Sequence, residues 1–343
     1  MTNPPPFRWG LTADSLQVEG LAPAADWTLT SARWPAVPGW DRWLDEFADS
    51  GPRPLTDVRI TLEWARMEPA AEKVDTGVIE HLRDLLAELR ARDLRVWATL
   101  HHGTLPGWFA VDEHGYADKR SRTFWWPRHV ENCGEWFGDL VDVWVPIDEP
   151  IRWATAAQPA LPDYEGRSRE LVRDTLLAEL TAARILSGGP GLVATAHELR
   201  TDNDRVGWCW TRALSEGLIE VPGLAHVEEP DYATVFDIVG VTLRQSPKPL
   251  PSPTSDEGGP GQFDGGGVGV DEGIERLGQR LPDQRVTIVG HGLEGAADNQ
   301  FAEWAEQTAD EVDTLVAGGA PIDGWFWGRP LTHPTRGLGS RAN

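Results

Sequence analysis

The sequence predicts a single α/β domain, a (β/α)₈ TIM barrel that spans residues 1–343, and three observations support this prediction. Short runs rich in Val, Ile and Leu alternate with longer amphipathic stretches, which is the pattern of βα units around a parallel sheet. There are eight such runs, the strand number of the barrel. The chain has 343 residues, 40% of them hydrophobic, which is enough to build one core of barrel size.

The eight apolar runs are the predicted strands, and each ends close to polar residues. In chain order they are residues 7–11, 58–62, 95–100, 141–147, 192–196, 235–242, 286–289 and 322–327.

Helical patterns lie between these runs. The clearest spans residues 76–92, where one stripe is apolar and the other face is charged: Val78, Leu82, Leu85, Leu86 and Leu89. Residues 171–186 and 300–316 show the same periodicity. A Pro- and Gly-rich stretch, 246–269, follows the sixth strand. In a barrel this stretch overhangs the active face, and it is either a lid or a disordered insertion.

Composition excludes several classes of partner. With 54 acidic and 31 basic residues the formal charge is −23, so nucleic acid and anionic membranes would be repelled.

We expect a cytoplasmic protein, because a basic segment followed by an apolar run is absent at the start and no run of 18 apolar residues occurs. Cys133 and Cys209 are expected to be buried free thiols, and the histidine spacing predicts no metal and no cofactor. The 18 tryptophans suit either a core or the binding of sugar rings and polyols.

Polar residues at strand ends are the candidate site, since barrel enzymes build their active sites there. In chain order they are Gln17, Glu19, Arg59, Glu63, His101, His102, Asp148, Glu149, His197, Glu198 and His291.

Glu149 is the leading catalytic candidate. A carboxylate at an apolar barrel mouth is expected to have a raised pKa, which would let it donate a proton near neutral pH. Because Pro150 follows, we also expect Glu149 to be held in an extended conformation.

Four segments carry a family resemblance, in order along the chain. They are FRWG and QVEG within residues 7–20, RITLEWAR at 59–66, TLHHGTLP at 99–106, and FGDLVDVW leading to DEP within 137–150. These segments resemble motifs of family 1 glycoside hydrolases, which are retaining β-glycosidases with a (β/α)₈ fold.

The resemblance implies a role for each matching residue. Glu149 would be the general acid/base, Gln17 and His102 would contact sugar hydroxyls, and Arg59 would brace the catalytic carboxylates. Asp148 replaces the family's asparagine, so the amide that normally contacts the sugar 2-hydroxyl is missing.

The chain departs from the family in its last three strands. Where the family has I-T-E-N-G, this chain has IVGHG at 288–292, so that Gly290 stands in the place of the nucleophile. Thr242-Leu243-Arg244 replaces the family's N-Y-Y, and the sugar-binding motif after strand eight is absent. Trp325 and Trp327 remain candidate ligand contacts.

Standard retaining hydrolysis is therefore not expected, because a glycine cannot act as a nucleophile. We favour an acid/base reaction on a glycoside or polyol-like small molecule, such as cyclisation, isomerisation or elimination in a biosynthetic pathway. Glu149 would transfer the proton, and His102, His197 or His291 would be its partner.

Three alternatives stay open. An inverting hydrolase would use Glu294, Asp148 or Glu198 as base. A substrate whose own neighbouring group attacks would allow hydrolysis without an enzyme nucleophile. A non-catalytic descendant would bind a glycoside or a protein partner in a tryptophan-lined cavity.

Overall fold

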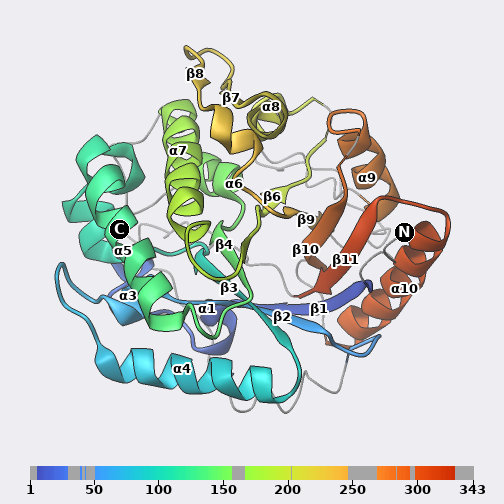
Figure 1. Cartoon of the computed structure of the whole chain (residues 1–343), viewed down its shortest axis with the longest axis horizontal. Coiled ribbons are helices and arrows are strands. Elements are labelled where there is room, and N and C mark those ends of the chain that lie inside the picture. Colours follow the sequence, from blue (N-terminus) through green and yellow to red (C-terminus); the bar gives the residue numbers. More distant parts are fainter. Residues whose placement is uncertain are drawn as a thin grey trace, which may run out of the picture.

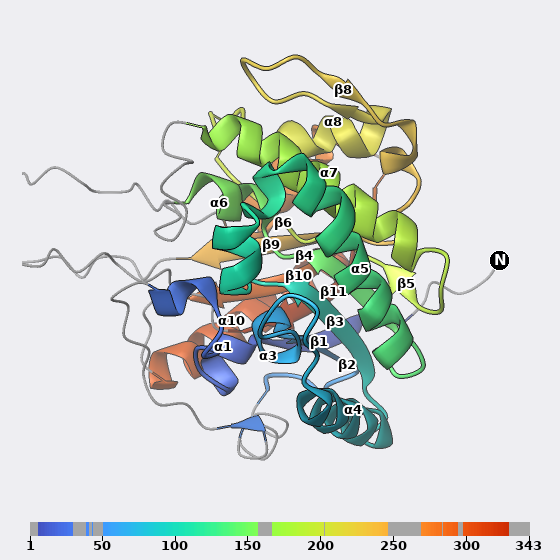
Figure 2. The ribbon, with the colours of Figure 1, turned by 90° about the vertical axis from the view of Figure 1, so that its left-hand side faces the viewer.

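The computed structural model describes residues 6–29, 39–40, 43, 51–156, 167–201, 203–245, 269–282, 284–293 and 298–328. Its main sheet is parallel, with the strand order β5-β4-β3-β2-β1-β11-β10-β9-β6 (Figures 1 and 2). The strands are β1 (Arg8–Ala13), β2 (Asp57–Thr61), β3 (Arg95–His101), β4 (Val143–Ile147), β5 (Leu192–Val193), β6 (His197–Glu198), β9 (Val239–Gln245), β10 (Val286–Leu293) and β11 (Ile322–Trp327).

The two edge strands, β5 and β6, are parts of one interrupted strand, and this closes the barrel. The backbone N–H of Ala194 donates to the carbonyl of Trp144 in β4, and that of Thr195 donates to the carbonyl of Ile238. The segment between β5 and β6 thus bonds to both neighbouring strands, which leaves no open edge. The predicted (β/α)₈ barrel is confirmed, with strand five broken in its middle.

Helices surround the sheet in Figure 1. The long ones are α4 (Thr76–Ala91), α5 (Lys119–Phe137), α7 (Ser168–Leu186), α9 (Val270–Gly278) and α10 (Asp298–Ala317), and the short ones are α1 (Ser15–Val18), α3 (Trp64–Met67), α6 (Pro150–Thr155) and α8 (Cys209–Glu216). The three predicted helices correspond to α4, α7 and α10. A small hairpin follows α8, formed by β7 (Leu218–Ile219) and β8 (Val227–Glu228).

The core has two layers because successive side chains of a barrel strand alternate between the interior and the helices. The interior is filled by Trp97, Val143, Val145, Ala194, Ala196, Ile238, Val289 and Phe326. The larger layer, between strands and helices, contains both cysteines, which are buried and free. The filled interior leaves space for a ligand only above it, at the carboxyl ends of the strands.

In the part of the chain that the structure describes, no helix has the length and apolar character that crossing a bilayer requires.

Candidate active site

A polar cavity of about 360 Å³, its open mouth included, lies at the carboxyl ends of the barrel strands. Its lining comes from β1, β2, β9, β10 and the residues that follow β1, β3, β4 and β11: Thr12, Asp14, Arg59, His102, Asp148, Glu149, Thr242, Leu243, Arg244, Gly290, His291, Gly292 and Gly328. A second cavity of about 260 Å³ shares His102, Asp148, Glu149 and Arg244 with it and extends to Arg152 and Trp153 of α6.

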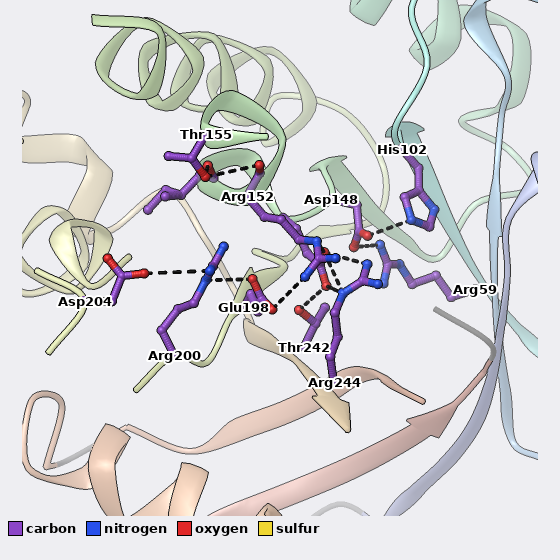
Figure 3. A network of polar contacts seen from close by, with 12 residues as sticks. Arg59, His102, Asp148, Arg152, Thr155, Glu198, Arg200, Asp204, Thr242 and Arg244 are labelled. Carbon is purple, nitrogen blue, oxygen red and sulfur yellow. Dashed lines mark hydrogen bonds and ion pairs between the residues drawn. The ribbon is translucent and has the colours of Figure 1, made fainter. Parts of the chain in front are cut away.

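Asp148 is held between the side chains of Arg59 and His102. Arg59 Nη2 donates to Oδ1, and His102 Nε2 lies 3.0 Å from Oδ2 (Figure 3). Arg59 is itself fixed, because Nε donates to Thr99 Oγ1 at 2.9 Å and Nη1 donates to the carbonyl of Val289 at 2.9 Å. Burial opposes the charge on Asp148, but Arg59 and His102 outweigh it and hold the pKa of Asp148 well below its usual range. Asp148 also raises the pKa of His102, against the effect of burial.

Glu149 adopts a left-handed backbone conformation, with φ 46° and ψ 53°. The expectation of an extended conformation is therefore wrong. Pro150 begins α6, with Glu149 as the N-cap residue. A following proline disfavours the right-handed helical region, and here the backbone enters the uncommon left-handed region instead. The backbone N–H of Glu149 donates to the carbonyl of Ala196 at 2.8 Å, which fastens this turn to strand five.

The carboxylate of Glu149 is clamped by Arg244. Arg244 Nε lies 2.9 and 3.0 Å from the two carboxylate oxygens and Nη2 donates to Oε2 at 2.7 Å, while Thr242 Oγ1 donates to Oε1 at 2.7 Å. Burial raises the pKa of Glu149, but Arg244 and Arg152 overcome it and lower the pKa to about 2. The expectation of a raised pKa is wrong for this state of the site, because the desolvated carboxylate has acquired a charged partner.

Glu198 lies on the far side of Arg152 from Glu149. Arg152 Nη1 donates to Glu198 Oε1 at 3.1 Å (Figure 3), while its Nε lies 3.5 Å from Glu149 Oε2. Arg200 Nε contacts the other oxygen of Glu198 at 2.7 Å. Burial, together with the charge of Glu149, raises the pKa of Glu198. Glu198 does not line either cavity, so it forms part of the supporting ion-pair network.

Gly290 faces the interior of the barrel at the end of the seventh strand. A Cβ atom built on it would lie 3.4 Å from Thr242 Cγ2 and 3.5 Å from Arg59 Nη1, which are ordinary contact distances. The pairing of β10 with β9 is irregular between Ile288 and Gly290. As a result, Val289 belongs to the interior core and Gly290 also faces inward.

Of the three histidines proposed as partners, only His102 has its imidazole against a cavity carboxylate. The ring of His197 stacks on Trp210 of α8, with centroids 4.5 Å apart, and its Nε2 lies 3.3 Å from Glu179 of α7. This places His197 between the strands and the helices. The expectation that it faces the cavity is wrong, because Ala194 and Ala196 are the interior residues of this segment.

His291 borders the cavity, yet its imidazole is engaged behind the barrel wall. Trp325 Nε1 donates to His291 Nδ1 at 3.0 Å, and the ring packs edge-on against Trp304 of α10. Burial lowers the pKa of His291 to about 3. The strand irregularity before Gly290 turns this side chain outward, so its expected place opposite Glu149 is not what the structure shows.

Trp325 and Trp327 lie on the outer face of β11. Phe326 between them belongs to the interior core, so both neighbours point to the helices. Their rings lie 5.4 Å apart, and Trp325 also contacts Trp9 at 5.9 Å. Neither lines the cavity, and the expectation that they contact a ligand there is wrong.

Glu63 and Gln17 are placed beside the site rather than in its lining. Glu63 accepts hydrogen bonds from Ser15 Oγ and from Thr104 Oγ1, both at 2.9 Å, which ties the loops after β1, β2 and β3 together. Gln17 is half-buried in α1.

Glu294 lies outside the described residues, as does nearly all of the 246–269 stretch.

Two charged residues that line the larger cavity, Asp14 and Arg244, were not among the candidates from the sequence. Arg244 was noted only as part of a lost family motif, although a cation at the end of an apolar strand was a usable signal. Asp14 directly follows the apolar run of β1, whereas the candidates in this segment, Gln17 and Glu19, lie further along the chain.

Comparison with known proteins agrees with this architecture. Residues 53–159 match the model of glycosyl hydrolase family 1. The chain is 28% identical to a lactase-like protein of Mus musculus over 169 residues, which are 43% of this chain and 30% of that protein. It is 27% identical to beta-glucosidase 30 of Arabidopsis thaliana over 197 residues, which are 50% of this chain and 33% of that protein. The matches thus span about a third of these curated relatives.

Solved structures extend the likeness to the whole fold. A beta-glycosidase from Pyrococcus horikoshii superposes with a TM-score of 0.71 and 17% identity, covering 95% of this chain and 84% of that one. The chain is therefore a (β/α)₈ barrel whose residues 53–159 are similar in sequence to glycosyl hydrolase family 1.

Proposed function

We propose that this protein is an acid/base enzyme that acts on a glycoside or polyol-like small molecule without forming a glycosyl-enzyme intermediate. The beta-glucosidase and the beta-glycosidase named above support the substrate class. The cavity lining supports it too, since the carboxylates of Asp148 and Glu149, the guanidiniums of Arg59 and Arg244, and His102 are groups that fix hydroxyls by charged hydrogen bonds.

The observation that carries the proposal is the pairing of a retained Glu149 with a bare Gly290 in one cavity. Retaining hydrolysis needs a second carboxyl about 5 to 5.5 Å from the first, and that carboxyl must attack the sugar. Gly290 offers only hydrogen in the direction of Arg59 and Thr242. A reaction that proceeds by proton transfer alone needs no group there.

Glu149 would enter such a reaction as a carboxylate and hence as a base. In the free protein Arg244 and Thr242 occupy both of its oxygens. A ligand that takes over the hydrogen bonds of Arg244 would release the carboxylate and raise its basicity, since the charge that lowers its pKa would be shared. The carboxylate of Glu149 could act as the base in a cyclisation, an isomerisation, an elimination or a single-displacement hydrolysis.

The test combines a panel of alkyl and aryl β-glycosides with the Glu149→Gln variant. We expect the variant to keep ligand affinity and to lose turnover by about 10²- to 10⁴-fold. Reaction in ¹⁸O-labelled water separates hydrolysis, which incorporates the label, from isomerisation or cyclisation. Glu198→Gln is the matched control, because that carboxylate belongs to the same ion-pair network but lines neither cavity. Full turnover by Glu149→Gln would overturn the proposal.

A non-catalytic binding protein is the second candidate, favoured by the clamp itself. A carboxylate that accepts hydrogen bonds from Arg244 and Thr242 is stable as a permanent structural ion pair. If that is its role, no member of the panel is turned over, and Glu149→Gln changes stability while leaving turnover at zero.

A further inference from the structure

Asp14 is a third buried carboxyl of the same cavity, beside Asp148 and Glu149, and the family resemblance gives it no role. It follows β1 directly, is 3% exposed, and lines the larger cavity together with Glu149. In the sheet order β4-β3-β2-β1, its strand is three places away from the strand that ends before Glu149. The two carboxyls therefore approach the cavity from different parts of the barrel rim.

The backbone fixes the orientation of Asp14 and leaves one oxygen for the cavity. Asp14 is the N-cap of α1, and its Oδ1 accepts the N–H of Gln17 at 2.8 Å. Among the described residues, Oδ2 accepts no hydrogen bond, and it is not one of the fully enclosed unpaired atoms. It is therefore the oxygen available to a molecule in the cavity.

Glu149 and Asp14 have different charged neighbours. Glu149 contacts Arg244 and Arg152 directly, whereas Asp14 has no cationic side chain within ion-pair distance among the described residues. Burial raises the pKa of Asp14 to about 6, while His102 after β3 and Arg244 of β9 act in the opposite direction and Asp148 after β4 adds to the rise. Two carboxyls that one site drives to opposite protonation states are a frequent arrangement for acid and base.

We propose that Asp14 is the proton donor of this site, facing the bound molecule as a carboxylic acid while Glu149 faces it as a carboxylate. This rests on the proposed function, and it assigns the acid to the residue that follows β1 rather than to the glutamate that the family resemblance implies.

The proton balance of this assignment is closed. Asp14 gives its proton to an oxygen of the bound molecule, and Glu149 takes a proton from a hydroxyl, a carbon or an attacking water. Asp14 ends as a carboxylate and Glu149 as an acid. Exchange of one proton each with solvent restores the site, so no oxidant, reductant or covalent intermediate is needed.

The first measurement is a ¹³C NMR titration of the aspartate carboxyls in the full chain, with Asp14→Asn to assign the resonance. Asparagine keeps a carbonyl oxygen to accept from the N–H of Gln17, so α1 retains its cap. We expect the Asp14 resonance to titrate with a midpoint near 6. A midpoint near 4, the ordinary value of an aspartate, would mean that burial does not help Asp14 to keep its proton, and this would overturn the assignment whether or not a substrate is known.

The second measurement is the pH dependence of turnover for the glycoside that the panel identifies. A required acid makes activity fall as the pH rises through the midpoint of Asp14. In Asp14→Asn we expect this alkaline limb to disappear and turnover to drop by about 10²- to 10⁴-fold. Unchanged turnover and an unchanged alkaline limb in Asp14→Asn would overturn the role of Asp14 even if Glu149→Gln is inactive.

Asp118→Asn is the matched control. Asp118 caps α5 in the same way, with its Oδ1 accepting the N–H of Ser121 at 2.9 Å, and it lines neither cavity. We expect full turnover and an unaltered pH profile in this variant. A loss of turnover equal to that of Asp14→Asn would show that the removal of a capping charge, not the loss of proton donation, explains both variants.

Discussion

Arg244 Nε and Nη2 donate to the two carboxylate oxygens of Glu149, at 2.7 to 3.0 Å, although the residues lie 95 positions apart in the chain. This pair sets the ionisation of the strongest catalytic candidate. Charge-assisted hydrogen bonds with two contact points combine strength with a fixed geometry, so the pair also determines where the carboxylate points.

Replacing Arg244 with methionine should raise the pKa of Glu149 from about 2 to above 4.5, because burial and the neighbouring Asp148 then act without the main opposing charge. The change is measurable by ¹³C NMR of the glutamate carboxyls. Arg200→Met is the control, since Arg200 contacts Glu198 and not Glu149. A pKa of Glu149 that stays near 2 in Arg244→Met would contradict the conclusion that Arg244 keeps this carboxyl ionised.

The same pair affects stability. In the wild type, the lowered folded-state pKa of Glu149 contributes stability above about pH 4.5, and this contribution is lost as the pH falls toward 2. Breaking a buried pair by removing one partner costs roughly 3 to 5 kcal/mol. We therefore expect Arg244→Met to be destabilised by that order at pH 7 and by less at pH 4, in urea denaturation. An equal loss of unfolding free energy at both pH values would mean that Arg244→Met acts through lost packing and not through lost charge.

Asp14→Asn should have the opposite dependence on pH. Because folding raises the pKa of Asp14 from 3.8 to about 6, its contribution to stability is fully present below pH 3.8 and is lost as the pH rises through 6. The loss amounts to about 3 kcal/mol at pH 8. Relative to wild type, the variant should gain up to that amount between pH 4 and pH 8. Asp118→Asn should show no such gain, since the folded-state pKa of Asp118 is lowered by the N–H of Ser121. Its contribution is lost as the pH falls below 3.8 and changes little at higher pH. Parallel behaviour of the two variants would exclude a raised pKa for Asp14.

Gly290→Glu should restore a carboxyl at the seventh strand. A Cβ atom there meets only ordinary contacts, and Arg59 Nη1 lies 3.5 Å from it, ready to pair with a new carboxylate. We expect this variant to form a covalent adduct with a 2-fluoro aryl glycoside, detected by intact mass. Gly290→Gln has nearly the same size and cannot attack, so it should remain unlabelled. Labelling of the wild type would refute the loss of the nucleophile.

Trp325→Phe should cost stability without changing ligand affinity. It removes the donor to His291 Nδ1, and leaving a buried acceptor unpaired costs roughly 1 to 3 kcal/mol. The matched variant is Trp153→Phe, which also removes one indole hydrogen bond, to the carbonyl of Gly103 at 2.9 Å, but lines the second cavity. We expect KM to rise only in Trp153→Phe. A higher KM in Trp325→Phe would restore Trp325 as a ligand contact.

The sequence by itself determined the barrel and part of its rim. Strand and helix periodicity are local properties, so the strands and α4, α7 and α10 could be located from spacing alone. The ends of strands two, three and four could be located in the same way, which is why Arg59, His102, Asp148 and Glu149 were found before the structure, and all four line the cavity.

The tertiary structure alone decided which way side chains face and which charges meet. One irregularity in β10 turns Gly290 inward and His291 outward, and regular alternation could not anticipate it. Thr242 and Arg244 reach Glu149 across more than 90 residues of sequence. These contacts depend on the closure of the barrel, which brings the fourth and sixth strands to either side of strand five. The ionisation of Glu149 and of Asp14 follows from that closure, because pKa values respond to neighbours in space and not to neighbours in sequence.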